Sequence, residues 1–457
     1  MTDGFAELRR REFARLDAGG HVYLDYTGAG LYADSQVRAH ADYLCAGVLG
    51  NPHSRNPSSR AATEAVEAAR ARVLRFFRAD PAEYEVVFTL NASGALKLIA
   101  ESYPWEAGSR FVLTADNHNS VNGMREYALA RGAEVAYVPL DAGLRVAGVD
   151  AELAGADPAR AHLFAFPAQS NFSGVKHPLE WIATARERGF RVLLDAAAFV
   201  ATSPLALDRH SPDFVTVSFY KMFGFPTGVG ALLARREALS VLRRPWFSGG
   251  TVRFVSAQNR VHLPHVTGRA FEDGTLNYLG IAAVGTGLDF LEGIGIERIG
   301  EHVARLTELL LGELAALRHS SGEPMVRFYG PATAERRGGC VAFNLVDPSG
   351  AVVDFRVVEE RANADDVSIR TGFFCNPGAA ECAFEYPGDD AFRCIKTLTP
   401  ETFTLQEFAD CMSEHPAGAV RASLGIASNE ADVRRLLEVL ATFRDAPASV
   451  SVAAAVG

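Results

Sequence analysis

The sequence predicts an α/β protein with a mostly parallel sheet covered by helices, followed by a smaller α+β domain. Three observations support this. Short β-rich runs alternate with helical patterns from about residue 60 to 280. Asp195 and Lys221 each follow an apolar run, as ligand-binding residues do at the carboxyl ends of parallel strands. At 457 residues, with 48% hydrophobic and 22% charged side chains, the chain is long enough for two domains.

The individual elements follow from hydrophobic periodicity, because helices repeat apolar residues every three or four positions and buried strands are short apolar runs. Strands are expected at Glu85–Thr89, Phe111–Thr114, Glu134–Val138, His162–Phe166, Val192–Leu194 and Phe214–Val217, and then at Met325–Tyr329, Gly339–Leu345 and Val367–Thr371. Helices are expected at Ala61–Phe77, Gly94–Tyr103, Tyr278–Leu291 and Ala431–Phe443.

Composition excludes several classes of protein. A net charge of −10 argues against binding to nucleic acid or to an anionic membrane. No apolar run reaches the length of a membrane span, and the N-terminus does not read as a signal peptide, so we expect a cytoplasmic protein.

The six scattered cysteines show no CxxC pair and predict neither a metal site nor a disulfide framework. Cys45 and Cys340 lie in a helical and a strand pattern, and we expect both in the core.

Lys221 and Asp195 are the first candidates for chemistry. Lys221 follows a buried strand and opens a glycine-rich turn, where desolvation favours the neutral, nucleophilic amine that could hold an aldehyde cofactor as a Schiff base. Asp195 ends the preceding strand and could keep the pyridine nitrogen of pyridoxal phosphate protonated. Alone, the lysine could simply cap a core strand and the aspartate could be a helix N-cap; their pairing on consecutive strands favours the cofactor.

Three polar loops follow other strands of the same region. Ser93 opens a helix, where backbone amides and its hydroxyl suit a phosphate, although Asn-Ala-Ser-Gly is also an ordinary helix start. His118 could stack on the cofactor ring and move protons, or be a surface group. Gln169 and Asn171 could hydrogen-bond the ring hydroxyl or the substrate, with a plain turn about equally probable on sequence grounds.

A second segment, Arg370–Gly378, combines a cation with a thiol. Arg370 offers a bidentate grip on a substrate carboxylate. Cys375 stands in a Gly- and Pro-rich loop, a setting for exposure and mobility, and Cys382 is a secondary candidate nearby. Arg421 is either a second carboxylate ligand or a structurally paired arginine.

In this order, the motifs resemble the class V, fold-type I pyridoxal-phosphate enzymes, and most closely the cysteine-desulfurase-like domain of molybdenum cofactor sulfurases. The resemblance covers nearly the whole chain. The matching segments are Tyr23–Gly30, Gly50–Ser54, Asp116–His118, Pro167–Gly174, Leu194–Ala197, Ser218–Lys221, Phe271–Thr275 and Arg370–Gly378.

The resemblance implies an architecture and a set of roles. It implies a seven-stranded large domain at 26–285, a small domain at 286–445, an N-terminal segment at 1–25 packed on the small domain, and a tail at 446–457 that we expect to be disordered. It also implies roles for individual side chains. Lys221 would hold the cofactor, Asp195 would contact its pyridinium nitrogen, and His118 would cover its ring face. The cofactor phosphate would be bound by Ala92, Ser93, Ser218 and, from the neighbouring subunit of a homodimer, Thr275. Asn171 would lie beside the cofactor. The substrate would be bound by Arg370, Arg421, Asn171 and His53, and Cys375 would carry a persulfide.

Three departures from the family pattern stand out. Asn91–Ser93 supplies one hydroxyl where relatives often have two, and Ala198 replaces a glutamine of many desulfurases. The sequence also ends near residue 457, without the C-terminal domain by which eukaryotic relatives bind the molybdenum cofactor. The resemblance therefore supports desulfurase chemistry and leaves delivery to that cofactor open.

The activity expected is removal of sulfur from L-cysteine to give alanine and a Cys375 persulfide, which is passed to an acceptor protein or cofactor. The alternative is a pyridoxal-phosphate C–S lyase, selenocysteine lyase or aminotransferase without a persulfide relay. A non-catalytic scaffold is disfavoured by the intact lysine, aspartate, histidine and arginine set.

Overall fold

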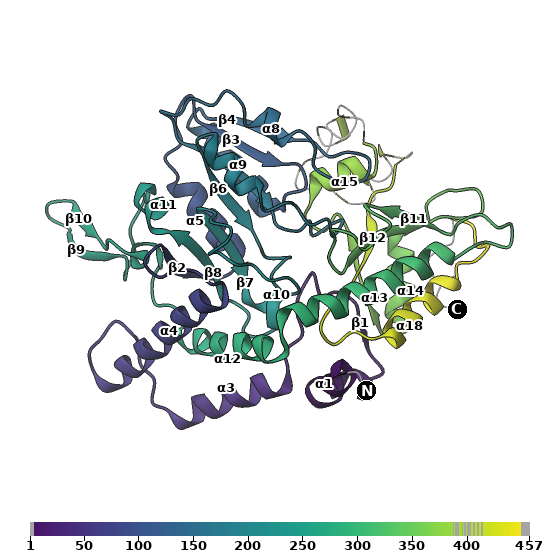
Figure 1. Cartoon of the computed structure of the whole chain (residues 1–457), viewed down its shortest axis with the longest axis horizontal. Coiled ribbons are helices and arrows are strands. Elements are labelled where there is room, and N and C mark those ends of the chain that lie inside the picture. Colours follow the sequence, from purple (N-terminus) through teal and green to yellow (C-terminus); the bar gives the residue numbers. More distant parts are fainter. Residues whose placement is uncertain are drawn as a thin grey trace.

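The computed structural model describes residues 4–386 and 415–448, together with residues 388, 393, 394, 396, 399, 404, 407, 408, 411 and 412. Its largest element is a seven-stranded sheet, which confirms the predicted fold class (Figure 1). Neighbouring strands are parallel except around β8, which runs antiparallel to β2 and β7. The order is β2 (Tyr84–Thr89), β8 (Gly230–Arg235), β7 (Phe214–Ser218), β6 (Phe190–Asp195), β5 (His162–Pro167), β3 (Arg110–Thr114) and β4 (Glu134–Val138).

Helices bury both faces of this sheet. Successive side chains of a strand point to opposite faces. Val112 of β3 therefore belongs to the apolar cluster that includes residues of α4, α9 and α12, whereas Phe111 and Leu113 belong to the cluster that includes residues of α5, α7 and α11. The helices of this region are α3 (Asp34–Ala46), α4 (Pro57–Phe76), α5 (Ala92–Ser102), α6 (Asn119–Asn122), α7 (Met124–Ala130), α8 (Val149–Glu152), α9 (Trp181–Glu187), α10 (Phe219–Phe223), α11 (Arg236–Val241), the 3-10 turn η1 (Gly268–Phe271) and α12 (Tyr278–Ile294).

A smaller antiparallel sheet of order β11-β12-β15-β14 forms the second region. The expected strand Val367–Thr371 is divided, because β13 pairs with β1 whereas β14 pairs with β15. The elements are β11 (Val326–Tyr329), β12 (Cys340–Leu345), β13 (Val367–Ser368), β14 (Arg370–Gly372) and β15 (Ala419–Ser423), with helices α13 (Ile296–Ala316), α14 (Phe355–Ala364), α15 (Pro377–Ala383) and α18 (Glu430–Ala441).

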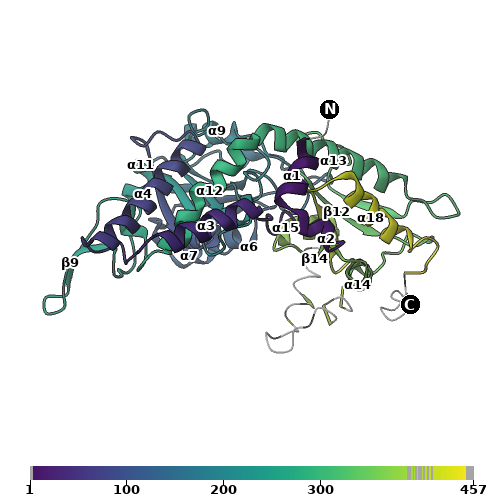
Figure 2. The same ribbon diagram turned by 90° about the horizontal axis from the view of Figure 1, so that it is seen from below.

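The N-terminal residues pack on this smaller region, as Figures 1 and 2 show. They form α1 (Gly4–Glu12), α2 (Ala14–Ala18) and β1 (Val22–Tyr23), which pairs in parallel with β13. Arg9 of α1 makes a buried 2.6 Å ion pair with Asp432 of α18. Of the tail expected to be disordered, residues 449–457 lie outside the described residues.

A hairpin of β9 (Val252–Ser256) and β10 (Val261–Pro264) projects from the far end of the large region in both views (Figures 1 and 2). In the part of the chain that the structure describes, no single helix has the length and apolarity of a membrane span. Only the pair α12 and α13 meets that criterion, taken together across a 68° bend.

The cysteines correct two expectations. Cys45 is exposed, because the buried residues of α3 are Gln36 and His40 and the cysteine lies outside that face. Cys394 and Cys411 form a disulfide, which their scattered spacing did not predict. Cys340 is buried, as expected.

Candidate active site

Lys221 lies in the first helical turn after β7. The turn is closed by Gly224 at φ 79°, where a Cβ atom would lie 2.2 Å from the Tyr32 nitrogen, so only glycine fits. Burial lowers the pKa of the Lys221 amine, and Asp195 and, more weakly, Cys375 oppose this shift. The site therefore favours a neutral amine and brings these three side chains within electrostatic reach of one another.

Asp195 is the last residue of β6, next to β7 in the sheet. The carboxylate is buried, and its Oδ1 accepts hydrogen bonds from the Ala197 backbone nitrogen (3.1 Å) and the Thr216 hydroxyl (3.3 Å). Oδ2 takes part in neither bond. This arrangement fixes the carboxylate and leaves one oxygen for a protonated ring nitrogen.

His118 follows β3 and caps α6. Its Nδ1 accepts a hydrogen bond from the Ser120 backbone nitrogen (3.1 Å), which assigns the proton of the neutral ring to Nε2. Burial lowers the pKa of His118, and the Asp195 carboxylate opposes that effect. The residue is therefore a half-buried, neutral imidazole beside Asp195 and not the free surface group that its loop alone allowed.

The N-terminus of α5 gathers the predicted phosphate ligands. Ser218 accepts a 2.9 Å hydrogen bond from the Ala92 backbone nitrogen, and Asn91 caps the helix through the Gly94 nitrogen. The Ser93 and Ser120 hydroxyl oxygens are 2.6 Å apart. Ser120 was missed because it lies 27 residues away in the short helix α6, and it provides a second hydroxyl beside Ser93.

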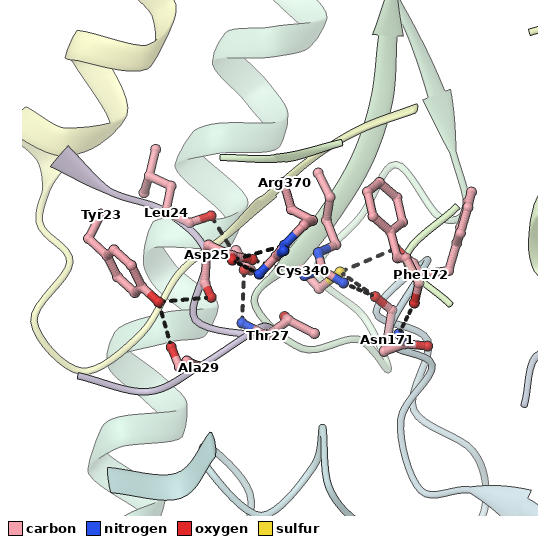
Figure 3. Close-up of polar contacts among 12 residues, drawn as sticks. Tyr23, Leu24, Asp25, Thr27, Ala29, Asn171, Phe172, Cys340 and Arg370 are labelled. Atoms are coloured by element: carbon pink, nitrogen blue, oxygen red, sulfur yellow. Dashed lines mark hydrogen bonds and ion pairs between the residues drawn. The ribbon is translucent and has the colours of Figure 1, made fainter. Parts of the chain in front are cut away.

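The two predicted substrate-binding arginines converge on Asp25, to which the motifs assigned no role (Figure 3). The Arg370 Nη2 lies 2.6 Å from Asp25 Oδ2, and the Arg421 Nη2 lies 2.9 Å from Oδ1. Arg421 is also 4.7 Å from the Phe374 ring centroid, in cation–π geometry. The sequence left open whether Arg421 is paired within the fold. In the structure, both Arg421 and Arg370 are paired with Asp25.

Cys375 lies in a turn that is hydrogen-bonded on both sides, in contrast to the mobile loop that its composition predicted. Asn171 Nδ2 donates to the Phe374 carbonyl (2.7 Å), and the Asn119 backbone nitrogen donates to the Cys375 carbonyl (2.7 Å). Asn376 is fully buried and donates to the Asn171 side chain (2.9 Å). The Cys375 side chain nevertheless remains exposed.

Thr275 and His53, which the resemblance assigned to the site, make their contacts in another part of the structure. Thr275 is exposed and its hydroxyl accepts a 3.2 Å hydrogen bond from Asn51. His53 is also exposed, and its ring abuts Gly250. The structure thus groups these two with the 50–54 and 249–275 segments, and no described contact joins them to Lys221.

A small cavity of about 30 Å³ opens beside Lys221 between the two regions. Ala198, where many desulfurases have glutamine, lines it together with Gln169. The amide oxygen of Gln169 is buried without a hydrogen-bond partner, and so is the Nε of Arg421. Such orphaned polar atoms suit a site that binds a polar ligand.

Comparison with known proteins identifies the family. The Aminotransferase class-V model matches residues 22–436. The chain is 38% identical to the molybdenum cofactor sulfurase of Bos taurus over 96% of its own length and 52% of that protein, and it spans about half the length of the curated relatives it matches.

Two solved structures share the fold. The cysteine desulfurase of Thermococcus onnurineus superposes with a TM-score of 0.78 at 23% identity, covering 96% of this chain and 97% of that one. The cysteine desulfurase CsdA of Escherichia coli superposes with a TM-score of 0.74 at 21% identity, covering 96% and 98%. The family model covers most of the chain and shows that the chain belongs to the aminotransferase class-V family of pyridoxal-phosphate enzymes.

Proposed function

We propose that this protein is a cysteine desulfurase that transfers sulfur through a persulfide on Cys375. The observation that carries the proposal is the position of Cys375: an exposed thiol, on a hydrogen-bonded turn, within electrostatic reach of both Lys221 and Arg370. A cysteine held there lies near the amine that would bind the cofactor and the cation that would bind the substrate carboxylate.

The donor set fits pyridoxal phosphate. Lys221 would hold the cofactor through its amine, Asp195 would face the pyridinium nitrogen, and the His118 ring would cover one face of it. The hydroxyls of Ser93 and Ser218 and the start of α5 would hold the phosphate. When bound, the cofactor supplies an electron sink that labilises the bonds at the substrate α- and β-carbons.

The chain's own residues would then divide the work. The neutral Lys221 amine would take the α-proton of cysteine, because burial lowers its pKa. The Cys375 thiol would attack the substrate sulfur: the carbon–sulfur bond breaks, a sulfur–sulfur bond forms, and the protons end on the alanine that leaves and on the persulfide. Exposure of Cys375 supports transfer of that sulfur to an acceptor protein or cofactor.

Cys375→Ala tests the relay, with Cys382→Ala as a matched control. Cys382 is partly exposed and belongs to the adjoining helix α15. We expect Cys375→Ala to lose protein-bound persulfide and nearly all alanine formation, and Cys382→Ala to retain both. Normal alanine and persulfide formation in Cys375→Ala would overturn the proposal.

The second candidate is a C–S lyase without a relay, because a cystine C–S lyase shares this fold with a TM-score of 0.71 at 20% identity. A lyase gives pyruvate and ammonia where a desulfurase gives alanine. Quantifying alanine, pyruvate and sulfide from purified enzyme and L-cysteine, with and without reductant, therefore separates the two.

We also infer a homodimer. Apolar side chains of the projecting hairpin and its base are exposed, including Phe254, Leu263 and Trp246, and Thr275 is exposed near the same segments. A second copy would cover this surface and let Thr275 reach the neighbouring phosphate site. Light scattering of wild type and of Phe254→Asp with Leu263→Asp tests this: we expect a dimer for the first and a monomer for the second.

A further inference from the structure

Asp25 is a buried carboxylate shared by two arginines. Its Oδ2 accepts hydrogen bonds from Nε (3.0 Å) and Nη2 (2.6 Å) of Arg370 (Figure 3). Its Oδ1 accepts one from Nη2 of Arg421 (2.9 Å). Each carboxylate oxygen thus serves one guanidinium. The two arginines are partners on the neighbouring strands β14 and β15, and they lie 345 and 396 positions after Asp25 in the sequence.

The backbone around Asp25 fixes this geometry. The Gly28 and Ala29 nitrogens donate to the Asp25 carbonyl (2.9 and 3.1 Å), and the Thr27 nitrogen donates to the Ser423 hydroxyl (2.9 Å). A Cβ atom on Gly28 would lie 2.5 Å from Asp25 Oδ2 and 2.8 Å from Arg370 Nη2. The ion pair therefore packs directly against a glycine in a closed turn.

The charges of this cluster do not cancel. Two guanidinium groups carry two positive charges and Asp25 carries one negative charge, which leaves one positive charge. The remaining charge has the sign that attracts a substrate carboxylate.

The two arginines differ in how far their hydrogen bonds are already used. Arg421 is buried and donates through Nη1 to the Asn171 carbonyl (2.9 Å) as well as to Asp25. The Arg370 side chain is 52% exposed, and its Nη1 takes part in neither bond to Asp25. Arg370 therefore presents an open edge while Asp25 holds its other edge.

We propose that Asp25 is a positioning residue for substrate recognition: it aims the open edge of Arg370 at the carboxylate of an amino-acid substrate. This rests on the proposed function only in taking an amino acid as substrate. Asp25 acts through Arg370 and does not touch the reacting atoms.

The test compares the binding of L-alanine and L-alaninamide, which differ only in the carboxylate, by titrating the holoenzyme and following the visible absorption of its cofactor. We expect wild type to prefer L-alanine strongly, Asp25→Asn to reduce that preference at least tenfold, and Arg370→Gln to abolish it. The double variant should equal Arg370→Gln alone, because Asp25 acts through Arg370. The ratio of two ligands does not depend on the fraction of folded protein.

Asp208→Asn is the matched control, since Asp208 pairs with Arg78 at an exposed position; we expect no change in preference. Asp25→Glu keeps the charge and should retain more of the preference than Asp25→Asn, which keeps the test decisive if the latter does not fold. An unchanged preference in Asp25→Asn, or a preference in the double variant that differs from that of Arg370→Gln, would overturn the proposal.

The outcome is separate from the desulfurase test. If L-cysteine gives no alanine but Asp25→Asn still lowers the carboxylate preference, the proposed function falls and the role of Asp25 stands. If alanine forms normally from L-cysteine and Asp25→Asn leaves the carboxylate preference unchanged, the proposed function stands and the role of Asp25 falls.

Discussion

The side-chain amide of Asn376 donates a 2.7 Å hydrogen bond to the backbone carbonyl of Asp116, across 260 residues of sequence. The same amide reaches Asn171, and the Asp116 side chain forms a buried 2.7 Å contact with His177. A continuous polar chain therefore connects the residue after Cys375 to the loop that carries His118. This chain of hydrogen bonds fixes the position of the Cys375 turn relative to the loop of His118.

Asn376→Ala should release this turn. The change leaves the Asp116 carbonyl and the Asn171 amide without a buried partner, so we expect the free energy of unfolding to fall by about 1–3 kcal/mol. Persulfide formation should slow roughly tenfold, because left-handed backbone at both Phe374 and Cys375 would lose its support. Denaturant unfolding measures the first effect, and the rate at which protein-bound persulfide forms from L-cysteine measures the second. Asn259→Ala, in the exposed hairpin turn, is the control; equal effects from both variants would contradict the interpretation.

Gly378→Ala should disturb the same turn by steric overlap. A Cβ atom there would lie 2.2 Å from the Ala115 carbonyl oxygen, so the start of α15 must shift away from the large region. We expect a lower melting temperature and slower persulfide formation. Gly285→Ala in α12 has open space around its Cβ and should stabilise by up to ~1 kcal/mol. A Gly378→Ala variant as stable and active as wild type would show that α15 is not docked as described.

The Lys221 amine should react at lower pH than an exposed lysine. Burial lowers its pKa, so its neutral form is present at a pH where an exposed amine is still protonated. In cofactor-free protein, the labelling rate of Lys221 by reductive methylation should rise with pH through a lower midpoint than that of the exposed Lys97, followed by mass spectrometry. Because Asp195 opposes the shift, Asp195→Asn should lower the Lys221 midpoint further. A midpoint at or above that of Lys97 would disprove the assignment.

The buried pair of Arg9 and Asp432 should hold the N-terminal segment in place. Asp432→Asn removes one charge and leaves the other buried, which typically costs about 3–5 kcal/mol. Arg9 also contacts Asp17, whose side chain is exposed, so Asp17→Asn should cost no more than about 1 kcal/mol. Denaturant unfolding of both variants tests this difference, and similar losses would contradict it.

Strand ends were predictable because they follow apolar runs, and this placed Lys221, Asp195 and His118 at one edge of the sheet. The strand β8 was missed because Gly-Ala-Leu-Leu-Ala-Arg favours a helix by local propensity, and pairing with β2 and β7 overrides that preference. β15 was missed too, and with it the partner that divides Val367–Thr371 into two strands.

Polar partners across the fold were harder to predict than the strand ends. Asp25 stood in a matching motif, but its contacts with Arg370 span 345 residues and no local pattern reports them. Asn376 has the same property: beside a Gly- and Pro-rich loop it reads as a turn residue, and only the folded chain brings it to Asp116. Local composition therefore predicted a mobile loop at Cys375. In the structure, hydrogen bonds from distant residues hold the backbone of this turn in place.

The pairing of β1 with β13, and of Arg9 with Asp432, has a consequence for biosynthesis. A ribosome makes the opening twenty or so residues first, yet their partners emerge only after more than three hundred others. The strands of the large region can pair with one another during this time, while the N-terminal segment that contains Arg9 and β1 still lacks its partners. These contacts, and the cluster of Asp25 with Arg370 and Arg421, can therefore form only after the residues of the smaller region have been translated.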